Sequence, residues 1–102
     1  NFIDRLNSIY PEQMFASNFS DAIFLDVRKP MELEQEGKIK KSINIRLQEL
    51  PERVCDLNPD KKYLVYCAGG YRSMIAASIL KARNFKSVYN IYGGFNSIKK
   101  FL

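Results

Sequence analysis

The residues with the most obvious chemical potential form one short stretch, Cys67-Ala-Gly-Gly-Tyr-Arg-Ser73. An apolar run from Tyr63 to Tyr66 ends at Cys67, two glycines follow, and a helical pattern starts near Tyr71. This order predicts a buried strand, a tight loop and the start of a helix, with one thiol at the mouth of the loop. Because the thiolate is the reactive form of cysteine, we interpret Cys67 as a catalytic nucleophile.

Three features of the loop favour a negative charge on this sulfur. Gly69 and Gly70 can adopt backbone angles that other residues resist, so successive N–H groups can turn inward around an anion. The loop opens a helix, whose free N–H groups and dipole favour negative charge, and Arg72 adds a permanent cation. The chain has no histidine, so we expect a thiolate that needs no general base. The alternative is a buried cysteine followed by an ordinary glycine-containing turn.

The length, net charge and cysteine count of the chain limit the functions that this site can have. The 102 residues suffice for one domain, predicted to span 1–102. The absence of an initiator Met at Asn1 suggests a piece of a longer protein or a processed protein. The net charge is +5, but the basic residues are scattered, so nucleic acid is not an expected partner. We expect no membrane span and no signal peptide, and a cytoplasmic protein with reduced thiols. Two cysteines alone make neither a Cys-x-x-Cys pair nor a zinc site, so no metal and no cofactor is predicted.

The elements that must position the loop alternate between strand and helix. Short apolar runs predict strands ending at Tyr10 and spanning 22–25, 42–45, 63–66 and 88–91. Helical spacing and turn residues predict helices at 11–18, 30–35, 48–56, 71–83 and 95–102. The alternation predicts an α/β fold with a parallel sheet, helices on both faces and right-handed crossovers. Such sheets bind ligands outside the carboxyl ends of their strands, where Cys67 is expected.

Several side chains outside the loop are expected to be buried. Phe2 and Ile3, with Leu6, are predicted anchors of the polar lead-in, and Met14 and Phe15 are predicted to face the core. Cys55 is expected to be an inert packing thiol, because free cysteine is among the most buried residue types. Pro51 is tolerable only in a first helical turn, which leaves the start of helix 48–56 open.

The stretch 67–73 resembles the active-site loop of the rhodaneses, a family of sulfurtransferases with the pattern Cys-x-x-Gly-x-Arg-Ser. Further matches to the family follow in the same order from about residue 22 to 98: Leu25-Asp-Val-Arg28 with Glu32, Gly37-Lys-Ile39, Ser42-Ile-Asn44 and Tyr92-Gly-Gly-Phe95. Lys38 stands where the family usually has His, and the Trp that often follows the Gly-Gly-Phe turn is absent. The loop segment also resembles rhodanese domains fused to metallo-β-lactamase-fold persulfide dioxygenases, which predicts the C-terminal domain of such a fusion protein.

The resemblance implies a three-layer rhodanese-like fold with a central parallel sheet of about five strands. It also implies a cycle in which Cys67 takes sulfur from a small anionic donor, thiosulfate or a low-molecular-weight persulfide, and passes it to cyanide, a thiol or sulfite. A fused or separate enzyme of sulfur metabolism is an expected partner. The backbone N–H groups of Ala68, Gly69, Gly70, Tyr71 and Arg72 are expected to hold the persulfide. Tyr71 is expected to point outward, and Arg72 to orient the loop and attract the donor.

Three further residues are expected to support the loop: Ser73, Asp26 and Arg28. We expect Arg28 to pair with a nearby carboxylate such as Glu32, the alternative being contact with substrate. Asp26 is interpreted as an acceptor that fixes a loop and not as an acid or base.

Two other functions compete with sulfur transfer. Related phosphatases use a Cys-x5-Arg loop, whereas the spacing from Cys67 to Arg72 is one residue shorter and should enclose a smaller cavity that suits sulfur. We therefore expect negligible phosphatase activity. A non-catalytic binding or regulatory module of a larger protein is the other alternative, and the presence of Cys67 with its glycines and Arg72 argues against it.

Overall fold

A computed structural model describes residues 7–102, so the predicted anchors Phe2, Ile3 and Leu6 lie outside the described residues. The described chain forms one five-stranded parallel sheet with strand order β1-β5-β4-β2-β3. The strands are β1 Asn7–Ile9, β2 Ile23–Asp26, β3 Ile43–Asn44, β4 Lys62–Tyr66 and β5 Ser87–Ile91. The predicted α/β fold with a parallel sheet of about five strands is confirmed, and β4 occupies its centre.

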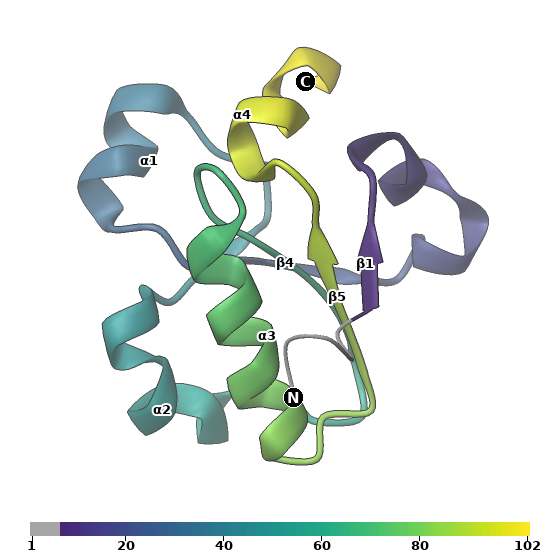
Figure 1. Cartoon of the computed structure of the whole chain (residues 1–102), viewed down its shortest axis with the longest axis vertical. Coiled ribbons are helices and arrows are strands. Elements are labelled where there is room, and N and C mark those ends of the chain that lie inside the picture. Colours follow the sequence, from purple (N-terminus) through teal and green to yellow (C-terminus); the bar gives the residue numbers. More distant parts are fainter. Residues whose placement is uncertain (1–6) are drawn as a thin grey trace.

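Helices cover both faces of this sheet (Figure 1). The α-helices are α1 Pro30–Glu36, α2 Leu50–Arg53, α3 Tyr71–Ala82 and α4 Gly94–Ile98. Short 3-10 turns complete them at Pro11–Phe15, Ser17–Phe19, Leu47–Glu49, Val54–Asp56 and Lys99–Phe101. None of the helices in the described part of the chain has the length and apolarity needed to cross a bilayer.

Alternation along β4 divides the core into two layers. Tyr63, Val65 and Cys67 pack in one cluster with residues of α2 and α3. Leu64 and Tyr66 point to the opposite face, where the N-terminal 3-10 turns and α4 supply the partners. Successive side chains of a strand face opposite sides of a sheet, so this register directs Cys67 toward the face that α3 covers.

Three predicted helices are divided into shorter pieces, and the predicted helix 95–102 consists of α4 and the 3-10 turn Lys99–Phe101. The segment 11–18 forms two 3-10 turns, because Ala16 between them is extended (φ −65°, ψ 150°). As a result Met14 is buried but Phe15 is 63% exposed, so the prediction of a buried Phe15 is wrong. The ring of Phe15 packs edge-on against that of Phe101 near the surface.

The predicted helix at 48–56 consists of a 3-10 turn, the four-residue α2 and a second 3-10 turn. Pro51 lies in the first turn of α2, as its missing N–H requires. Cys55 lies in the second 3-10 turn and is exposed, so the expectation of a buried packing thiol is wrong. Its Sγ lies 3.8 Å from the carbonyl oxygen of Glu52.

Candidate active site

Cys67 follows the last residue of β4 and therefore lies at the carboxyl end of the central strand. The residue is 1% exposed. Its Sγ accepts hydrogen bonds from the N–H groups of Gly70 at 3.1 Å and Ser73 at 3.3 Å. The Ser73 Oγ lies 3.5 Å from the same sulfur. The loop and the first turn of α3 therefore wrap around the sulfur with donors aimed at it, an arrangement that suits a negative charge.

Only one of the two loop glycines needs its special backbone freedom. Gly70 has φ +107°, a conformation that L side chains rarely adopt, and it precedes the first residue of α3. A Cβ there would lie 3.4 Å from the backbone N of Gly93. At Gly69 no atom lies within 4 Å of the position a Cβ would take, and its φ is not positive. The tight turn around the sulfur therefore depends on Gly70.

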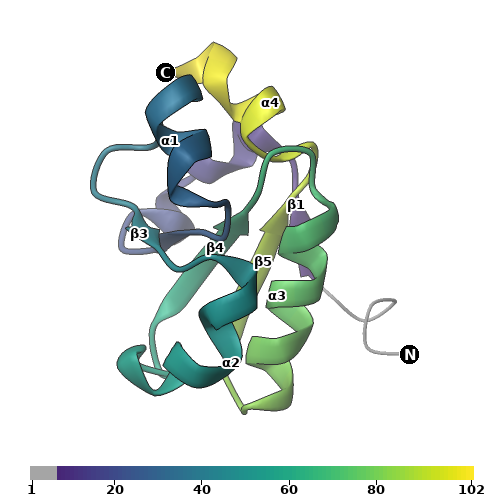
Figure 2. The ribbon, with the colours of Figure 1, turned by 90° about the vertical axis from the view of Figure 1, so that its left-hand side faces the viewer.

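The first turn of α4 holds the loop from outside. The N–H of Phe95 donates to the carbonyl oxygen of Cys67 at 2.7 Å, and that of Asn96 donates to Ala68 at 3.0 Å. Figure 2 shows the loop between β4 and α3 beside the start of α4. Because C=O and N–H of a trans peptide point in opposite directions, the following N–H groups face away from α4. Gly94 permits this contact, since a Cβ on it would lie 2.3 Å from the Cys67 oxygen.

Arg72 forms a bidentate ion pair with Glu32 of α1. Its Nη1 and Nη2 each lie 2.8 Å from one carboxylate oxygen of Glu32. Glu32 also accepts a hydrogen bond from the backbone N–H of Lys29 at 2.8 Å. The hydrogen bond from Arg72 lowers the pKa of Glu32 to about 2, and the same bond raises the pKa of Arg72 above its usual value. The pair joins the start of α3 to the first turn of α1.

Arg28 forms its ion pair with Asp26. A nearby carboxylate was the predicted partner, but Glu32, the example given for it, is not the residue that Arg28 pairs with. Both residues are buried, and Arg28 Nη2 lies 2.7 Å from Asp26 Oδ2 and 2.8 Å from the Gly37 carbonyl oxygen. Its backbone N–H and Nε also donate to Asp26. Burial opposes the charged form of Arg28, but the bond to Asp26 holds its pKa above the usual value. Asp26 accepts these bonds within the connection from β2 to α1, and its predicted role as a support of the loop and not an acid or base stays a prediction.

Arg28 also explains how α4 is held in place. Its guanidinium lies 4.2 Å from the centre of the Phe95 ring, a cation–π distance.

Tyr71, the first residue of α3, is 75% exposed and points outward as predicted.

Asn90 in β5 is a residue of this site that the sequence reasoning missed. It is 1% exposed, and its Oδ1 lies 2.5 Å from the Ser73 Oγ. The signal in the sequence was a polar residue inside the apolar run 88–91.

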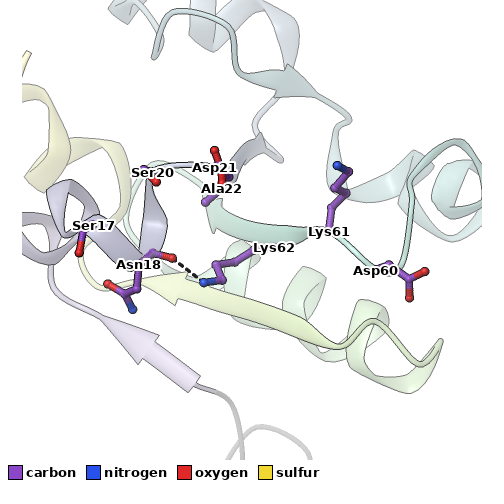
Figure 3. A pocket seen from close by; sticks show the side chains of 8 residues that line it. All are labelled: Ser17, Asn18, Ser20, Asp21, Ala22, Asp60, Lys61 and Lys62. Carbon is purple, nitrogen blue, oxygen red and sulfur yellow. Dashed lines mark hydrogen bonds between the residues drawn. The ribbon is translucent and has the colours of Figure 1, made fainter.

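A surface pocket of about 510 Å³ lies away from this site (Figure 3). Lys62, the first residue of β4, lines it and donates from Nζ to the Asn18 carbonyl oxygen. Asp21, Asp60 and Lys61 also line it, so its charges are mixed. Because Cys67 follows the other end of β4, the pocket is not part of the cysteine site.

Comparison with known proteins identifies the family. Residues 12–101 match the model of the rhodanese-like domain, and the chain belongs to this family. It is 34% identical over 91 residues to the uncharacterized protein YqhL of Bacillus subtilis, covering 89% of this chain and 71% of that protein. It is 32% identical over 87 residues to the thiosulfate sulfurtransferase GlpE of Pseudomonas syringae, covering 85% of this chain and 81% of that protein.

A solved structure agrees with the sequence relatives. The rhodanese-related protein of Thermoplasma volcanium superposes with a TM-score of 0.84 at 37% identity, covering 93% of this chain and 92% of that chain. Some matches are parts of longer proteins; the matched region spans 26% of the tRNA uridine(34) hydroxylase of Corynebacterium diphtheriae. That this chain comes from a fusion protein stays a prediction.

Proposed function

We propose that this domain is a sulfurtransferase that carries a sulfane sulfur on Cys67. The observation that carries the proposal is the sulfur atom at the end of β4, which accepts N–H bonds from Gly70 and Ser73. Sulfurtransferases among its relatives support the reaction class. Cys67 is 1% exposed, so a donor with a terminal, unhindered sulfur fits the site better than a bulky one.

In the first half-reaction the Cys67 thiolate attacks the outer sulfur of the donor. With thiosulfate, a new bond forms between Sγ and that sulfur, the S–S bond of thiosulfate breaks, and sulfite leaves with the electron pair. Cys67 then carries a persulfide anion. With a low-molecular-weight persulfide the same step releases a thiolate.

In the second half-reaction a nucleophilic acceptor attacks the outer sulfur of this persulfide. With cyanide, a carbon–sulfur bond forms, the S–S bond to Cys67 breaks, and the Sγ leaves as a thiolate while thiocyanate departs. A thiol or sulfite accepts the sulfur in the same way. The cycle thus returns Cys67 to its starting state without an external oxidant or reductant.

The loop backbone is the proposed cradle for the outer sulfur. The N–H groups of Ala68 and Gly69 face away from α4, because the carbonyl oxygens of Cys67 and Ala68 bond to it. Together with the N–H groups of Gly70 to Arg72 they offer donors to the negative outer sulfur, like those of an oxyanion hole. We assign Arg72 chiefly to orienting the loop, since its guanidinium is bound at both ends by Glu32.

The test is the gain of one sulfur by Cys67. Because Cys55 is exposed and could react as well, the experiment uses the Cys55→Ser variant as the reference protein. We expect incubation with thiosulfate to add the mass of one sulfur atom, seen by intact-protein mass spectrometry. The adduct should be absent when Cys67→Ser is added to the same background.

Two results would overturn the proposal. Absence of a sulfur adduct with both thiosulfate and a small persulfide would favour the non-catalytic binding module. Efficient hydrolysis of an aryl phosphate by the unchanged domain would instead place it with the phosphatases.

A further inference from the structure

Asn90 is a buried polar residue in the run 88–91 of β5, whose other residues are apolar or aromatic. Its neighbours Val88 and Ile91 are fully buried, and Asn90 itself is 1% exposed. A buried amide costs free energy unless it is hydrogen-bonded, and an apolar residue would fill this position without that cost. Within residues 7–102 its side-chain partner is the Ser73 Oγ, 2.5 Å from Asn90 Oδ1. This contact leads directly to Cys67, since the Ser73 Oγ lies 3.5 Å from its Sγ.

The Ser73 Oγ also lies 3.1 Å from the Gly70 carbonyl oxygen. A hydroxyl has a single hydrogen, so Ser73 can donate to only one of Asn90 Oδ1, the Gly70 oxygen and Cys67 Sγ at a time. When Cys67 is a neutral thiol, its S–H donates to the Ser73 Oγ, and Ser73 donates to Asn90 Oδ1. When Cys67 is a thiolate, the sulfur only accepts, and Ser73 can bond to it only by turning its hydrogen toward Sγ. The Oδ1 of Asn90 would then face the Ser73 Oγ with no hydrogen between the two oxygens.

The amide of Asn90 can resolve this conflict by a half-turn. Exchanging Oδ1 and Nδ2 hardly changes the shape of the side chain. Nδ2 then donates to the Ser73 Oγ, and Ser73 donates to the sulfur. The bond that this exchange breaks in the described part of the chain is the one from Ser73 to Oδ1.

We propose that Asn90 is a positioning residue that acts through the Ser73 hydroxyl to supply the Cys67 thiolate with a third hydrogen bond. This bond adds to those from the N–H groups of Gly70 and Ser73. The inference rests on the proposed function, in which Cys67 is a thiolate at two points of the reaction cycle. It is the nucleophile that takes sulfur from the donor, and it is the group released when the persulfide gives its outer sulfur away.

The test measures the Cys67 thiolate without any sulfur donor. In the Cys55→Ser background, the rate of alkylation by iodoacetamide is followed at neutral pH by intact mass, and the thiolate is followed by its ultraviolet absorbance. Asn90→Leu and Ser73→Ala should each slow alkylation roughly 3- to 10-fold and lower the thiolate absorbance in parallel, because each removes one hydrogen bond to a charged sulfur. Gln48→Leu, at an exposed position of the 3-10 turn Leu47–Glu49, is the control and should keep the reference rate.

The double variant separates this role from a merely structural one. If Asn90 acts through Ser73, adding Asn90→Leu to Ser73→Ala should change the alkylation rate less than about twofold. A full additional loss in the double variant, or the reference rate in a folded Asn90→Leu protein, would overturn the proposal. Should Asn90→Leu fail to fold, the smaller and strand-favouring Asn90→Val takes its place in the same comparison.

The outcome is separable from that of the sulfur-transfer proposal. Sulfur loading on Cys67 together with unchanged alkylation in folded Asn90→Leu would remove only the role of Asn90. Coupled effects of Asn90 and Ser73 on alkylation without sulfur loading would remove only the sulfurtransferase assignment.

Discussion

At the scale of single residues, the surroundings of Cys67 are set by backbone atoms more than by side chains. Two N–H groups donate to its sulfur, and two N–H groups in the first turn of α4 donate to the carbonyl oxygens of Cys67 and Ala68. Side-chain size then matters chiefly where backbones approach closely. Gly94 is such a place, because its Cα faces the loop carbonyls without room for a Cβ.

Gly94→Ala should therefore destabilise the domain. The added Cβ would lie 2.3 Å from the Cys67 oxygen and 2.7 Å from the Ala68 oxygen, and φ is +56°. We expect a loss of roughly 2–4 kcal/mol in the free energy of unfolding, from overpacking and backbone strain together. Urea unfolding of Gly94→Ala and of the unchanged protein measures this difference in the free energy of unfolding.

Gly69→Ala is the matched control, because no atom lies within 4 Å of the place that its Cβ would occupy. Its free energy of unfolding should stay within about 0.5 kcal/mol of the unchanged protein. Equal losses for the two variants would contradict the role given to Gly94.

At the scale of elements, α1 is attached to the site through charge. Among its described residues none is buried, so packing alone holds it weakly. The bidentate pair of Glu32 with Arg72 joins its first turn to the first turn of α3. The two side chains are 24% and 28% exposed, so solvent screens the pair only in part.

Glu32→Gln tests this attachment through pH. The pKa of Glu32 is lowered from 4.5 to about 2, so its contribution is fully present above about pH 4.5 and is lost as pH falls toward 2. We expect Glu32→Gln to lower the free energy of unfolding near neutral pH by about 1–2 kcal/mol, after allowance for screening. The difference from the unchanged protein should shrink in urea titrations as pH falls below about 4.5.

Glu34→Gln, an exposed position on the same helix, serves as the control and should change stability by less than about 0.5 kcal/mol at either pH. A Glu32→Gln deficit that stays constant down to low pH would show that charge pairing is not its cause.

At the scale of the whole molecule, the buried pair of Asp26 and Arg28 ties several segments together. Arg28 contacts Asp26 at the end of β2, the Gly37 carbonyl oxygen after α1 and the Phe95 ring of α4. The carbonyl oxygens of Asp26 and Arg28 also accept from the side-chain amide of Asn44 in β3. One ion pair thus fixes the carboxyl edge of the sheet around the site.

Arg28→Gln should destabilise the domain strongly, because it leaves the Asp26 carboxylate buried without a cation. We expect a loss of roughly 3–5 kcal/mol in urea unfolding. Adding Asp26→Asn should recover part of this loss, since it removes the stranded charge.

Arg83→Gln, an exposed position after α3, is the control and should cost less than about 0.5 kcal/mol. If Arg28→Gln cost no more than this control, the pair would not hold the fold together.

The same scale shows what the sequence could and could not predict. Strands at 22–25 and 63–66 were predicted nearly to the residue, because short apolar runs between polar residues are local signals. The partner of Arg28 could not be predicted in this way, because Asp26 and Glu32 both lie near Arg28 in the sequence and burial decides between them. The exposure of Cys55 was missed because α2 and its flanking 3-10 turns replace one regular helix, which changes the faces of that segment.

In the candidate site, too, the features with local sequence signals could be predicted and the others could not. Its loop could be predicted from consecutive residues around Cys67, whereas its long-range contacts could not. The hydrogen bonds from α4 to the loop and the hydrogen bond between Ser73 and Asn90 join residues that only the folded sheet brings together. Such contacts leave at most a weak local signal in the sequence, as Asn90 did inside the apolar run 88–91.

The central claim is that Cys67 accepts a sulfur and passes it on, and a single-turnover experiment tests it most directly. The Cys55→Ser protein is loaded with thiosulfate, freed of excess donor and mixed with cyanide. We predict about one thiocyanate released per chain, with the protein mass falling back by one sulfur, and neither event after Cys67→Ser. Thiocyanate formed equally by the Cys67→Ser protein, or a sulfur adduct that cyanide does not remove, would contradict the account.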